Sequence, residues 1–361
     1  MFGDRVYQEM MAAALRLARR GEGRTSPNPM VGAVIFDRDG IVATGYHHKA
    51  GGPHAEILAL RKAGDRARGA SLAVNLEPCC HFGRTGPCTE AIIRAGIAEV
   101  VFAIEDPFPA VNGQGARFLQ NHGVKLVAGV LAEEAEELNE VYLTFIRTGR
   151  PFVVLKTAQS LDGRIATAAG ESRWISNAEA LKFAHRLRAR YDANVVGAGT
   201  ARTDNPQLTV RLVRGRNPLR IVVTSSPNLP QKLHLFTQND DHRTIVATTR
   251  EVIGSGAYST IETWPVRKGR EGIDLKSLLE QAAARQVTSL LFEGGGRLAT
   301  ALLRAGLVDK YYVVIAPMII GRGKEAVGEL GVRTLAGAIR FSKCGFRTIG
   351  TNTLFWGYPG K

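Results

Sequence analysis

The sequence predicts a two-domain α/β protein, and three observations support this. The chain has 361 residues, which is more than a single hydrophobic core usually organises. Short apolar runs alternate with amphipathic helical patterns in both halves of the chain. The turn-forming segment Thr148-Gly149-Arg150-Pro151 interrupts this alternation, and a strand pattern restarts after it. We therefore expect one domain over residues 1–147 and a second over residues 151–361.

The first half begins with a helical pattern at Met1–Arg20, because its apolar residues recur on one face. A turn at 37–40 then separates two apolar runs and predicts a hairpin. Strands are predicted at Val31–Phe36, Ile41–Tyr46, Ser71–Leu76, Val100–Ile104 and Val124–Ala128. Helices are predicted at His54–Ala63, Pro87–Ala95, Ala116–Asn121 and Glu133–Thr148.

The second half contains short runs rich in β-branched and other apolar residues, which suit the strands of a buried central sheet. Strands are predicted at Phe152–Ala158, Asn194–Gly197, Ile221–Thr224, Thr244–Ala247, Ser289–Phe292 and Tyr311–Ala316. Helices are predicted at Ala178–Arg190, Leu275–Arg285 and Leu298–Ala305. Residues 228–270 give the weakest pattern, and we expect surface loops and edge elements there.

Composition limits the classes of function. The formal net charge is +14, but the basic residues are spread along the chain, with no basic tail and no basic tract interleaved with aromatic residues. We interpret the charge as a solvated surface with a few phosphate-binding arginines, and we expect no nucleic-acid partner. No apolar run is long enough to span a bilayer, and the first twenty residues lack a signal-peptide pattern. A cytoplasmic protein is expected.

The most informative pattern is a His-Ala-Glu sequence followed by three closely spaced cysteines. His54, Cys79 and Cys88 offer one imidazole and two thiolates, a ligand set that zinc prefers and that leaves a fourth position for water. Glu56 lies two residues after the imidazole and can carry protons. We predict a zinc-dependent deaminase site with Glu56 as its catalytic acid and base. The competing interpretation is a closed structural zinc site with Cys80 or His81 as fourth ligand.

At this point the residues match a known family. The chain resembles the bifunctional deaminase–reductases of riboflavin biosynthesis. In the first half the matching stretches are Pro27–Gly32, Gly51–Glu56, Leu76–Cys88 and Asp106-Pro107. In the second half they are Lys156–Arg164, Gly170–Ile175, Gly199-Thr200, Asp204–Arg211 and Glu293–Gly295. The resemblance covers nearly the whole chain. One position departs from it, because Cys80 stands where many members have serine.

The resemblance implies a cytidine-deaminase-like three-layer domain followed by a dihydrofolate-reductase-like domain. It implies zinc-hydroxide deamination of 2,5-diamino-6-(5-phosphoribosylamino)pyrimidin-4-one, and then reduction of the ribosyl arm to ribityl by NADPH. Substrate contacts are expected in the first domain from Asn28, His47 and Asp106. In the second domain they are expected from Ser172, Arg188, Leu208, Arg211 and Glu293. NADPH contacts are expected from Ala158, Trp174, Thr200, Asp204, Ser225, Gly295, Gly296, Arg297, Leu298, Ala299, Thr300 and Ala301.

The residues of the second half support a cofactor site in a more limited way. No G-x-G-x-x-G stands in the strand–helix context of a standard dinucleotide fold. A glycine run at 294–296 nevertheless follows an apolar strand and precedes a helix, where backbone N–H groups can approach a phosphate. Asp204 and Glu293 are the candidates for proton handling at the sugar.

Several alternatives stay open at this level. One is a nucleic-acid deaminase of tRNA type with an accessory nucleotide-binding domain. Another is a zinc-stabilised binding module without catalysis, and a third is a chain in which only one activity is intact. We expect a homo-oligomer, a dimer or tetramer, because small reductase domains can pair their sheet edges.

Overall fold

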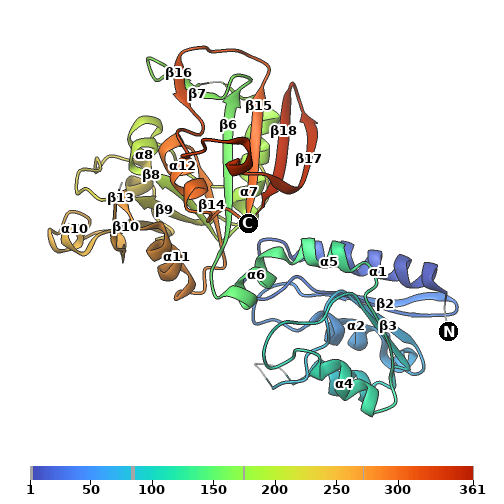
Figure 1. Ribbon diagram of the computed structural model, residues 1–361. Helices are drawn as coiled ribbons and strands as arrows, with labels where there is room; N and C mark the ends of the chain where they lie inside the picture. Colours follow the sequence, from blue (N-terminus) through green and yellow to red (C-terminus); the bar gives the residue numbers. More distant parts are fainter. Residues whose placement is uncertain (1–2, 83–85, 174, 271, 361) are drawn as a thin grey trace. The chain divides into compact units, whose positions relative to one another are not determined.

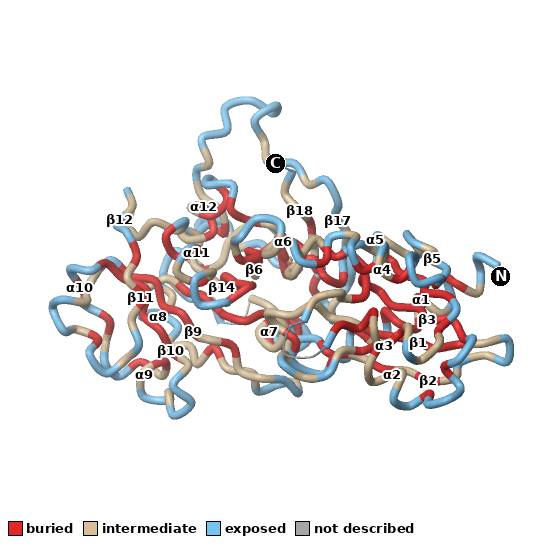
Figure 2. The backbone as a smooth tube through the Cα atoms, turned by 90° about the horizontal axis from the view of Figure 1, so that it is seen from below, coloured by how far each residue is buried: buried red, intermediate tan, exposed pale blue. Residues whose placement is uncertain are grey.

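The computed structural model describes residues 3–82, 86–173, 175–270 and 272–360. The chain divides into two compact units, residues 1–149 and residues 150–361 (Figure 1). In each unit the buried segments, red in Figure 2, gather in the strands, and much of the chain between elements is exposed. Each unit is described separately below.

The first unit contains a five-stranded sheet in the order β2-β1-β3-β4-β5. Its strands are β1 (Gly32–Asp37), β2 (Gly40–Tyr46), β3 (Ser71–Val74), β4 (Glu99–Phe102) and β5 (Lys125–Ala128). β1 pairs antiparallel with β2 and β3, whereas β3, β4 and β5 are parallel. All five lie at or within a few residues of the predicted ranges.

Helices cover both faces of this sheet. Successive residues of a strand point to opposite faces, so Ile35 packs on one side and Phe36 on the other. The helices α2 (Ala55–Ala63), α3 (Cys88–Arg94) and α4 (Gln114–Asn121) pack on the face of Ile35. The helices α1 (Asp4–Ala18) and α5 (Ala132–Leu138) pack on the face of Phe36. The unit is therefore the three-layer arrangement expected from the sequence.

One predicted helix of this unit is wrong. Glu133–Thr148 is not continuous but forms α5 and α6 (Glu140–Thr148), separated at Asn139. The buried Asn139 side chain accepts a hydrogen bond from the N–H of Met30 at 2.8 Å and donates one to its C=O at 3.0 Å. The break places this asparagine against a loop more than a hundred residues earlier, which a local helical pattern does not reveal.

The second unit is built on a nine-stranded sheet in the order β11-β10-β9-β8-β14-β6-β15-β18-β17. The strands from β11 to β15 in this order are parallel, and β18 and β17 add antiparallel pairs at one edge. Their bounds are β6 (Phe152–Ser160), β8 (Ala193–Gly197), β9 (Leu219–Val223), β10 (Thr244–Thr248), β11 (Glu262–Pro265), β14 (Ser289–Glu293), β15 (Lys310–Ala316), β17 (Phe341–Ile349) and β18 (Asn352–Pro359).

Helices also cover both faces of this second sheet. The helices α11 (Leu275–Ala283) and α12 (Gly296–Arg304) pack on one face. The short helices α8 (Ala198–Asp204), α9 (His234–Thr237) and α10 (Arg250–Gly254) pack on the other. Phe183 of α7 (Ala178–Arg190) meets the ring of Tyr312 edge-on. Two small antiparallel pairs complete the unit: β7 (Arg164–Thr167) with β16 (Gly323–Glu325), and β12 (Lys268–Gly269) with β13 (Gly272–Ile273).

The sequence patterns predicted no strand after Ala316, so the β17–β18 hairpin is an addition to the predicted sheet. Most of β17 is exposed, so it lacks the strongly apolar run that marks the central strands. Within the part of the chain that the structure describes, no helix has the length and apolar character needed to cross a membrane.

Candidate active sites

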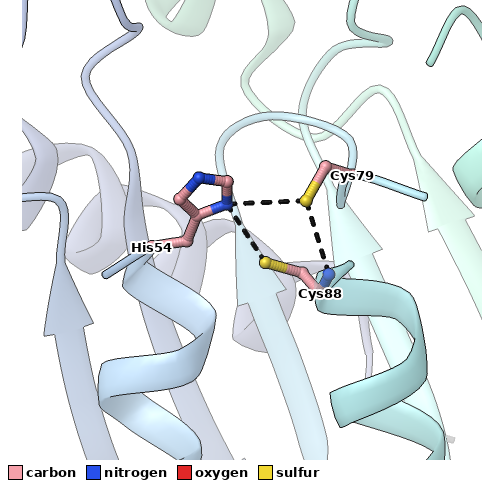
Figure 3. A group of neighbouring side chains, drawn as sticks. All are labelled: His54, Cys79 and Cys88. Atoms are coloured by element: carbon pink, nitrogen blue, oxygen red, sulfur yellow. Dashed lines mark hydrogen bonds between the residues drawn. The ribbon is translucent and has the colours of Figure 1, made fainter. Parts of the chain in front are cut away.

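Three side chains from separate elements meet in the first unit. His54 immediately precedes α2, Cys79 lies in the loop after β3, and Cys88 is the first residue of α3. Their ligand atoms all lie within 4.8 Å of one another. Figure 3 shows Nδ1 of the imidazole turned toward both sulfurs. The structure thus brings together the three ligands that the sequence predicts.

The distances fit a tetrahedral zinc ion. Nδ1 of His54 lies 3.3 Å from Sγ of Cys88 and 3.5 Å from Sγ of Cys79. Zinc bonds of about 2.0–2.1 Å to nitrogen and about 2.3 Å to sulfur, at a tetrahedral angle, place those atoms about 3.6 Å apart. The donor set and its spacing therefore suit zinc with three protein ligands.

The side chains of the cluster polarise one another. The pKa of Cys79 is lowered to about 4, chiefly by its hydrogen bond with Cys88 and further by the one with His54. The pKa of His54 is raised to about 9, chiefly by its hydrogen bond with Cys79. Cys79 is therefore a thiolate at neutral pH, which is the form that ligates a metal. A cation at this cluster competes with the proton for Nδ1 of His54, so binding releases that proton.

Glu56 lies in the first turn of α2, beside the cluster. Its side chain is buried, and its Oε2 atom is among the buried polar atoms that have no hydrogen-bond partner within the described residues. Burial raises the pKa of this carboxyl above its usual range, even though the charge of His54 opposes the shift. A buried oxygen without a partner is costly unless a ligand or water meets it. Glu56 is therefore placed to exchange a proton with a bound molecule.

Two of the predicted substrate contacts are linked to each other. Nδ1 of His47 lies 3.0 Å from the C=O of Pro53, an acceptor, so that nitrogen carries the proton. Nε2 of His47 is then free to accept from Nδ2 of Asn28, which lies 3.2 Å away. Burial lowers the pKa of His47, which agrees with a neutral ring. The pair orients the amide of Asn28, because its nitrogen is committed to the imidazole.

The third predicted contact, Asp106, belongs to a network around Cys79. Glu77 is buried, and its carboxylate accepts backbone N–H groups from Asp106 at 3.2 Å, Gly113 at 2.9 Å and Ala116 at 2.9 Å. The hydroxyl of Tyr142, on α6, donates to Oδ1 of Asp106 at 2.8 Å. Local sequence patterns give Glu77 and Tyr142 no role, because their hydrogen-bond partners lie 29 to 39 positions away along the chain.

The structure does not bring Cys80 or His81 into the metal cluster. Sγ of Cys80 lies 3.5 Å from the C=O of Ala110, and the ring of His81 packs against Phe108 with centroids 5.4 Å apart. The candidate ligand group among the described residues contains only the imidazole of His54 and the two thiols of Cys79 and Cys88. A closed site with either neighbour as fourth ligand is therefore not supported.

In the second unit the predicted cofactor contacts gather at the carboxyl ends of parallel strands. Ala158 lies near the end of β6, Thr200 follows β8, Ser225 follows β9, and the glycine run follows β14. Ligands of open parallel sheets bind at this edge. β8, β14 and β6 are neighbours in the sheet, so the residues that follow these strands lie in one region. Trp174, the aromatic residue among the predicted cofactor contacts, lies outside the described residues.

The glycine run allows a close approach. Gly294 has φ 74° and Gly295 has φ 71°, which side chains rarely adopt, and a Cβ on Gly295 would lie 3.0 Å from Oγ1 of Thr200. α12 begins at Gly296. The N–H groups of Leu298 and Ala299 bond the C=O of Gly295 at 3.1 Å, so those of Gly296 and Arg297 are the ones a ligand could meet. Thr300 and Ala299 are buried in the helix, and the Thr300 hydroxyl donates to the C=O of Gly296 at 2.6 Å. These two residues therefore help to pack the start of the helix.

Two of the predicted substrate contacts of this unit, Arg188 and Glu293, form an ion pair. Arg188 donates from Nε to Oε1 of Glu293 at 2.7 Å and from an amino nitrogen to Oε2 at 3.0 Å. Asn194, buried on β8, donates to Oε1 of the same carboxylate at 2.6 Å. Burial alone would raise the pKa of Glu293, but Arg188, Lys156 and Asn194 together outweigh it and lower the pKa to about 2. Glu293 is therefore an ionised acceptor at neutral pH.

Lys156, which had no predicted role, lies beside this ion pair, whereas Asp204, a candidate for proton handling at the sugar, has other charged neighbours. Lys156 is half-buried beside Glu293 and Arg188, and burial lowers its pKa. Asp204 instead faces the charges of Arg173 and Lys324. Lys156 is part of a segment that matches the family. It pairs with Glu293 in the register of β6 and β14, and this pairing places the two residues side by side.

Comparison with known proteins assigns the chain. Residues 151–355 match the RibD C-terminal domain, and residues 4–104 match the cytidine and deoxycytidylate deaminase zinc-binding region. The riboflavin biosynthesis protein RibD of Aquifex aeolicus is 42% identical over 97% of this chain and 98% of its own length. This chain belongs to the RibD family. RibD of Escherichia coli is 41% identical over 94% of this chain and 96% of its own length.

Solved structures agree with this RibD assignment. Acinetobacter baumannii RibD, form 1, superposes with a TM-score of 0.89 at 34% identity and covers 99% of this chain and all of that one. The Thermotoga maritima deaminase/reductase superposes with a TM-score of 0.86 at 35% identity, covering 99% of each chain. The expected fold class, a cytidine-deaminase-like domain joined to a dihydrofolate-reductase-like domain, is confirmed. So is the class of activity: a RibD-type deaminase and reductase of riboflavin biosynthesis. A tRNA-type deaminase is not favoured.

Proposed function

We propose that the first unit removes an amino group from a diaminopyrimidinone bearing a phosphoribosylamino arm. The second unit then reduces the ribosyl arm of the deaminated product with NADPH. The Thermotoga maritima relative is named for these two activities, as a diaminohydroxyphosphoribosylaminopyrimidine deaminase and 5-amino-6-(5-phosphoribosylamino)uracil reductase. The observation that carries the first half is the convergence of His54, Cys79 and Cys88 beside the buried Glu56.

In the deaminase, His54, Cys79 and Cys88 would hold zinc. Zinc in such a site makes water nucleophilic at neutral pH. Glu56 would accept one proton from the attacking water at Oε2 and pass it to a ring nitrogen. It would then carry the second proton of that water from the new hydroxyl group to the departing amino group, which leaves as ammonia. Its raised pKa suits this work, because a strongly acidic carboxyl would hold a transferred proton too weakly.

Asn28, His47 and Asp106 would orient the pyrimidine in the deaminase. The neutral His47 ring fixes the amide nitrogen of Asn28, which leaves the amide oxygen as an acceptor for a ring amino group. Asp106 is held by the hydroxyl of Tyr142 and by the N–H of Phe108 at 3.0 Å. These contacts let the chain recognise an aminopyrimidine by its hydrogen-bonding edge.

The test of this half separates metal binding from turnover. Glu56→Gln should keep zinc near one equivalent per chain and should lower ammonia release by at least about a hundredfold, the range typical of a lost acid–base group. Cys88→Ser should lose zinc and activity together. Zinc content is measured by metal analysis, and ammonia release by a coupled assay. A Glu56→Gln enzyme with wild-type turnover would overturn the role of Glu56.

In the reductase, the turn at Gly294 and Gly295 and the start of α12 would receive the phosphates of NADPH. Bound NADPH supplies the hydride. The glycine turn and the start of α12 support this placement, because a helix N-terminus offers backbone N–H donors and a partial positive charge to a phosphate. Ala158, Thr200, Asp204 and Ser225 would line the rest of the cofactor site.

Arg188, Arg211 and Lys156 would receive the phosphorylated sugar. Arginine binds phosphate oxygens in pairs through its planar guanidinium. Glu293, kept ionised by Arg188 and Asn194, would accept hydrogen bonds from sugar hydroxyls. Ser172 and Leu208 would complete this pocket.

A steady-state assay tests this half independently. The purified chain should oxidise NADPH when given the deaminated pyrimidine, and it should act on the diamino compound only after ammonia has been released. Preference for NADPH over NADH is checked in the same assay. We also propose that the enzyme is a homo-oligomer and has no nucleic-acid partner, which light scattering and an RNA-binding measurement at low salt would check.

A further inference from the structure

The segment of the second unit that carries Arg211 has a strained backbone. Leu208 is buried at 2% exposure with φ 55°, and Asn205 has φ 41°. A bulky residue in the left-handed region persists only where its surroundings over-determine the conformation. The contacts that hold this segment therefore decide where Arg211 lies.

Two anchors hold the segment from outside the substrate cluster. The N–H of His234 donates to Oδ1 of Asn205 at 2.7 Å, and the N–H of Val210 donates to Oδ1 of Asn217 at 2.8 Å. Both anchors use asparagine oxygens, and neither lies in the charged cluster around Glu293. They fix the shape of the segment but not its approach to α7.

The approach to α7 depends on two residues three positions apart on that helix, and therefore on one face of it. An amino nitrogen of Arg188 lies 3.5 Å from the C=O of Thr209. Nδ1 of His185 accepts the N–H of Arg211 at 2.9 Å, and the N–H of Leu212 lies 3.5 Å from the same nitrogen. The shorter contact is the one from Arg211 to His185.

The direction of this hydrogen bond fixes the state of the imidazole. A backbone N–H can only donate, so Nδ1 must carry a lone pair and the ring must be neutral. His185 is 1% exposed. The charged groups that face it are Arg188 on its own helix, Arg211 on the segment, Lys156 on β6 and Glu293 on β14. Burial and the three cations together lower its pKa to about 4.

The fixed backbone sets the direction of the arginine side chain. An amino nitrogen of the Arg211 guanidinium donates to Oγ1 of Thr209 at 2.6 Å. The guanidinium of Arg211 faces that of Arg188, and Arg188 and Lys156 in turn face the carboxylate of Glu293. The net charge of this cluster is positive, and a phosphate balances it.

We propose that His185 is a positioning residue of the reductase: its unprotonated Nδ1 holds the backbone of Arg211 and so aims the guanidinium at the phosphate of the substrate. This inference rests on the proposed function of the second unit. It assigns His185 a role in recognising the phosphorylated arm, which a histidine that only fills the core does not have.

The test compares two variants of His185 whose amide side chains differ in length by one methylene group. His185→Asn keeps an acceptor near the position of Nδ1, whereas His185→Gln moves the acceptor toward the position of Nε2. Both variants are polar and neither titrates. Arg186→Gln, at an exposed neighbouring position on the same helix, is the control for placing a glutamine on α7. Reductase KM and kcat are measured with the deaminated pyrimidine, with and without its phosphate.

We expect His185→Gln to raise KM for the phosphorylated compound about tenfold, the effect of one misplaced buried hydrogen bond. KM for the phosphate-free compound should change less than about twofold, and His185→Asn should stay within about threefold of wild type on both. In an Arg211→Met background, His185→Gln should add nothing, because the two residues act as one unit.

Three results would overturn the inference. The first is an equal loss on the phosphorylated and phosphate-free compounds, the second is equal behaviour of the two amides, and the third is additive effects with Arg211→Met. Failure of the proposed function looks different: the unaltered enzyme then does not oxidise NADPH with the deaminated pyrimidine at all.

Discussion

Gly45 controls how closely α2 approaches the sheet of the first unit. A Cβ built on this residue of β2 would lie 2.2 Å from the C=O of Ala55 and 2.7 Å from the N–H nitrogen of Ala59. Ala55 stands between the predicted ligand His54 and the predicted acid Glu56. We therefore predict that Gly45→Ala displaces the first turn of α2 and weakens the deaminase selectively.

The size of the effect follows from the overlap. Nonbonded carbon atoms rest at about 3.5–4.0 Å, and oxygen is slightly smaller, so α2 must retreat by about 1 Å. Overpacking of this kind costs about 1–3 kcal/mol of stability. A shift of about 1 Å between catalytic groups lowers turnover by on the order of a hundredfold. Deaminase kcat should fall by about that factor, and zinc affinity should fall with it.

The two activities in one chain provide the control. Ammonia release and zinc content are measured for Gly45→Ala, and NADPH oxidation is measured with pyrimidine that is already deaminated. Reductase activity should not change, because Gly45 lies in the first unit. Gly254→Ala is the matched glycine variant, since a Cβ there meets nothing within 4 Å. Deaminase turnover within twofold of wild type would refute the argument.

Three further predictions concern the other contacts. Gly296→Ala places a Cβ 2.1 Å from the C=O of Glu325, so KM for NADPH should rise about tenfold or more while ammonia release is unchanged. Tyr142→Phe removes the hydroxyl that holds Asp106, so deaminase KM should rise by about two- to tenfold, with the reductase as internal control. The pKa of His185 is about 4 in the folded chain against 6.5 for the free group, so the unfolded state takes up the extra proton as pH falls from 6.5 to 4. The free energy of unfolding of the second unit should fall by up to about 3 kcal/mol over that range, and His185→Asn should make this pH dependence flatter. Both are measured by calorimetry, in the unfolding transition whose temperature NADPH raises.

Local patterns predicted most of the regular structure because apolar periodicity reports which face of an element is buried. They failed where a long-range contact determined the result. Asn139 divides a helix because its side chain binds Met30, and β17 forms at a sheet edge from a mostly exposed segment. Tyr142, Glu77 and His185 were overlooked for the same reason: each acts on a partner that is distant in sequence.

The sequence by itself determined the chemistry of the first unit. An imidazole, two thiols and a carboxyl are a rare combination, and their residue types are sufficient to indicate zinc and proton transfer. Only the tertiary structure decided the electrostatics. Whether Arg188 is a solvated cation or the partner of Glu293, and whether His185 is neutral, depends on which strands and helices bury these groups together. Charge interactions vary with distance and burial, and neither is a property of a residue type alone.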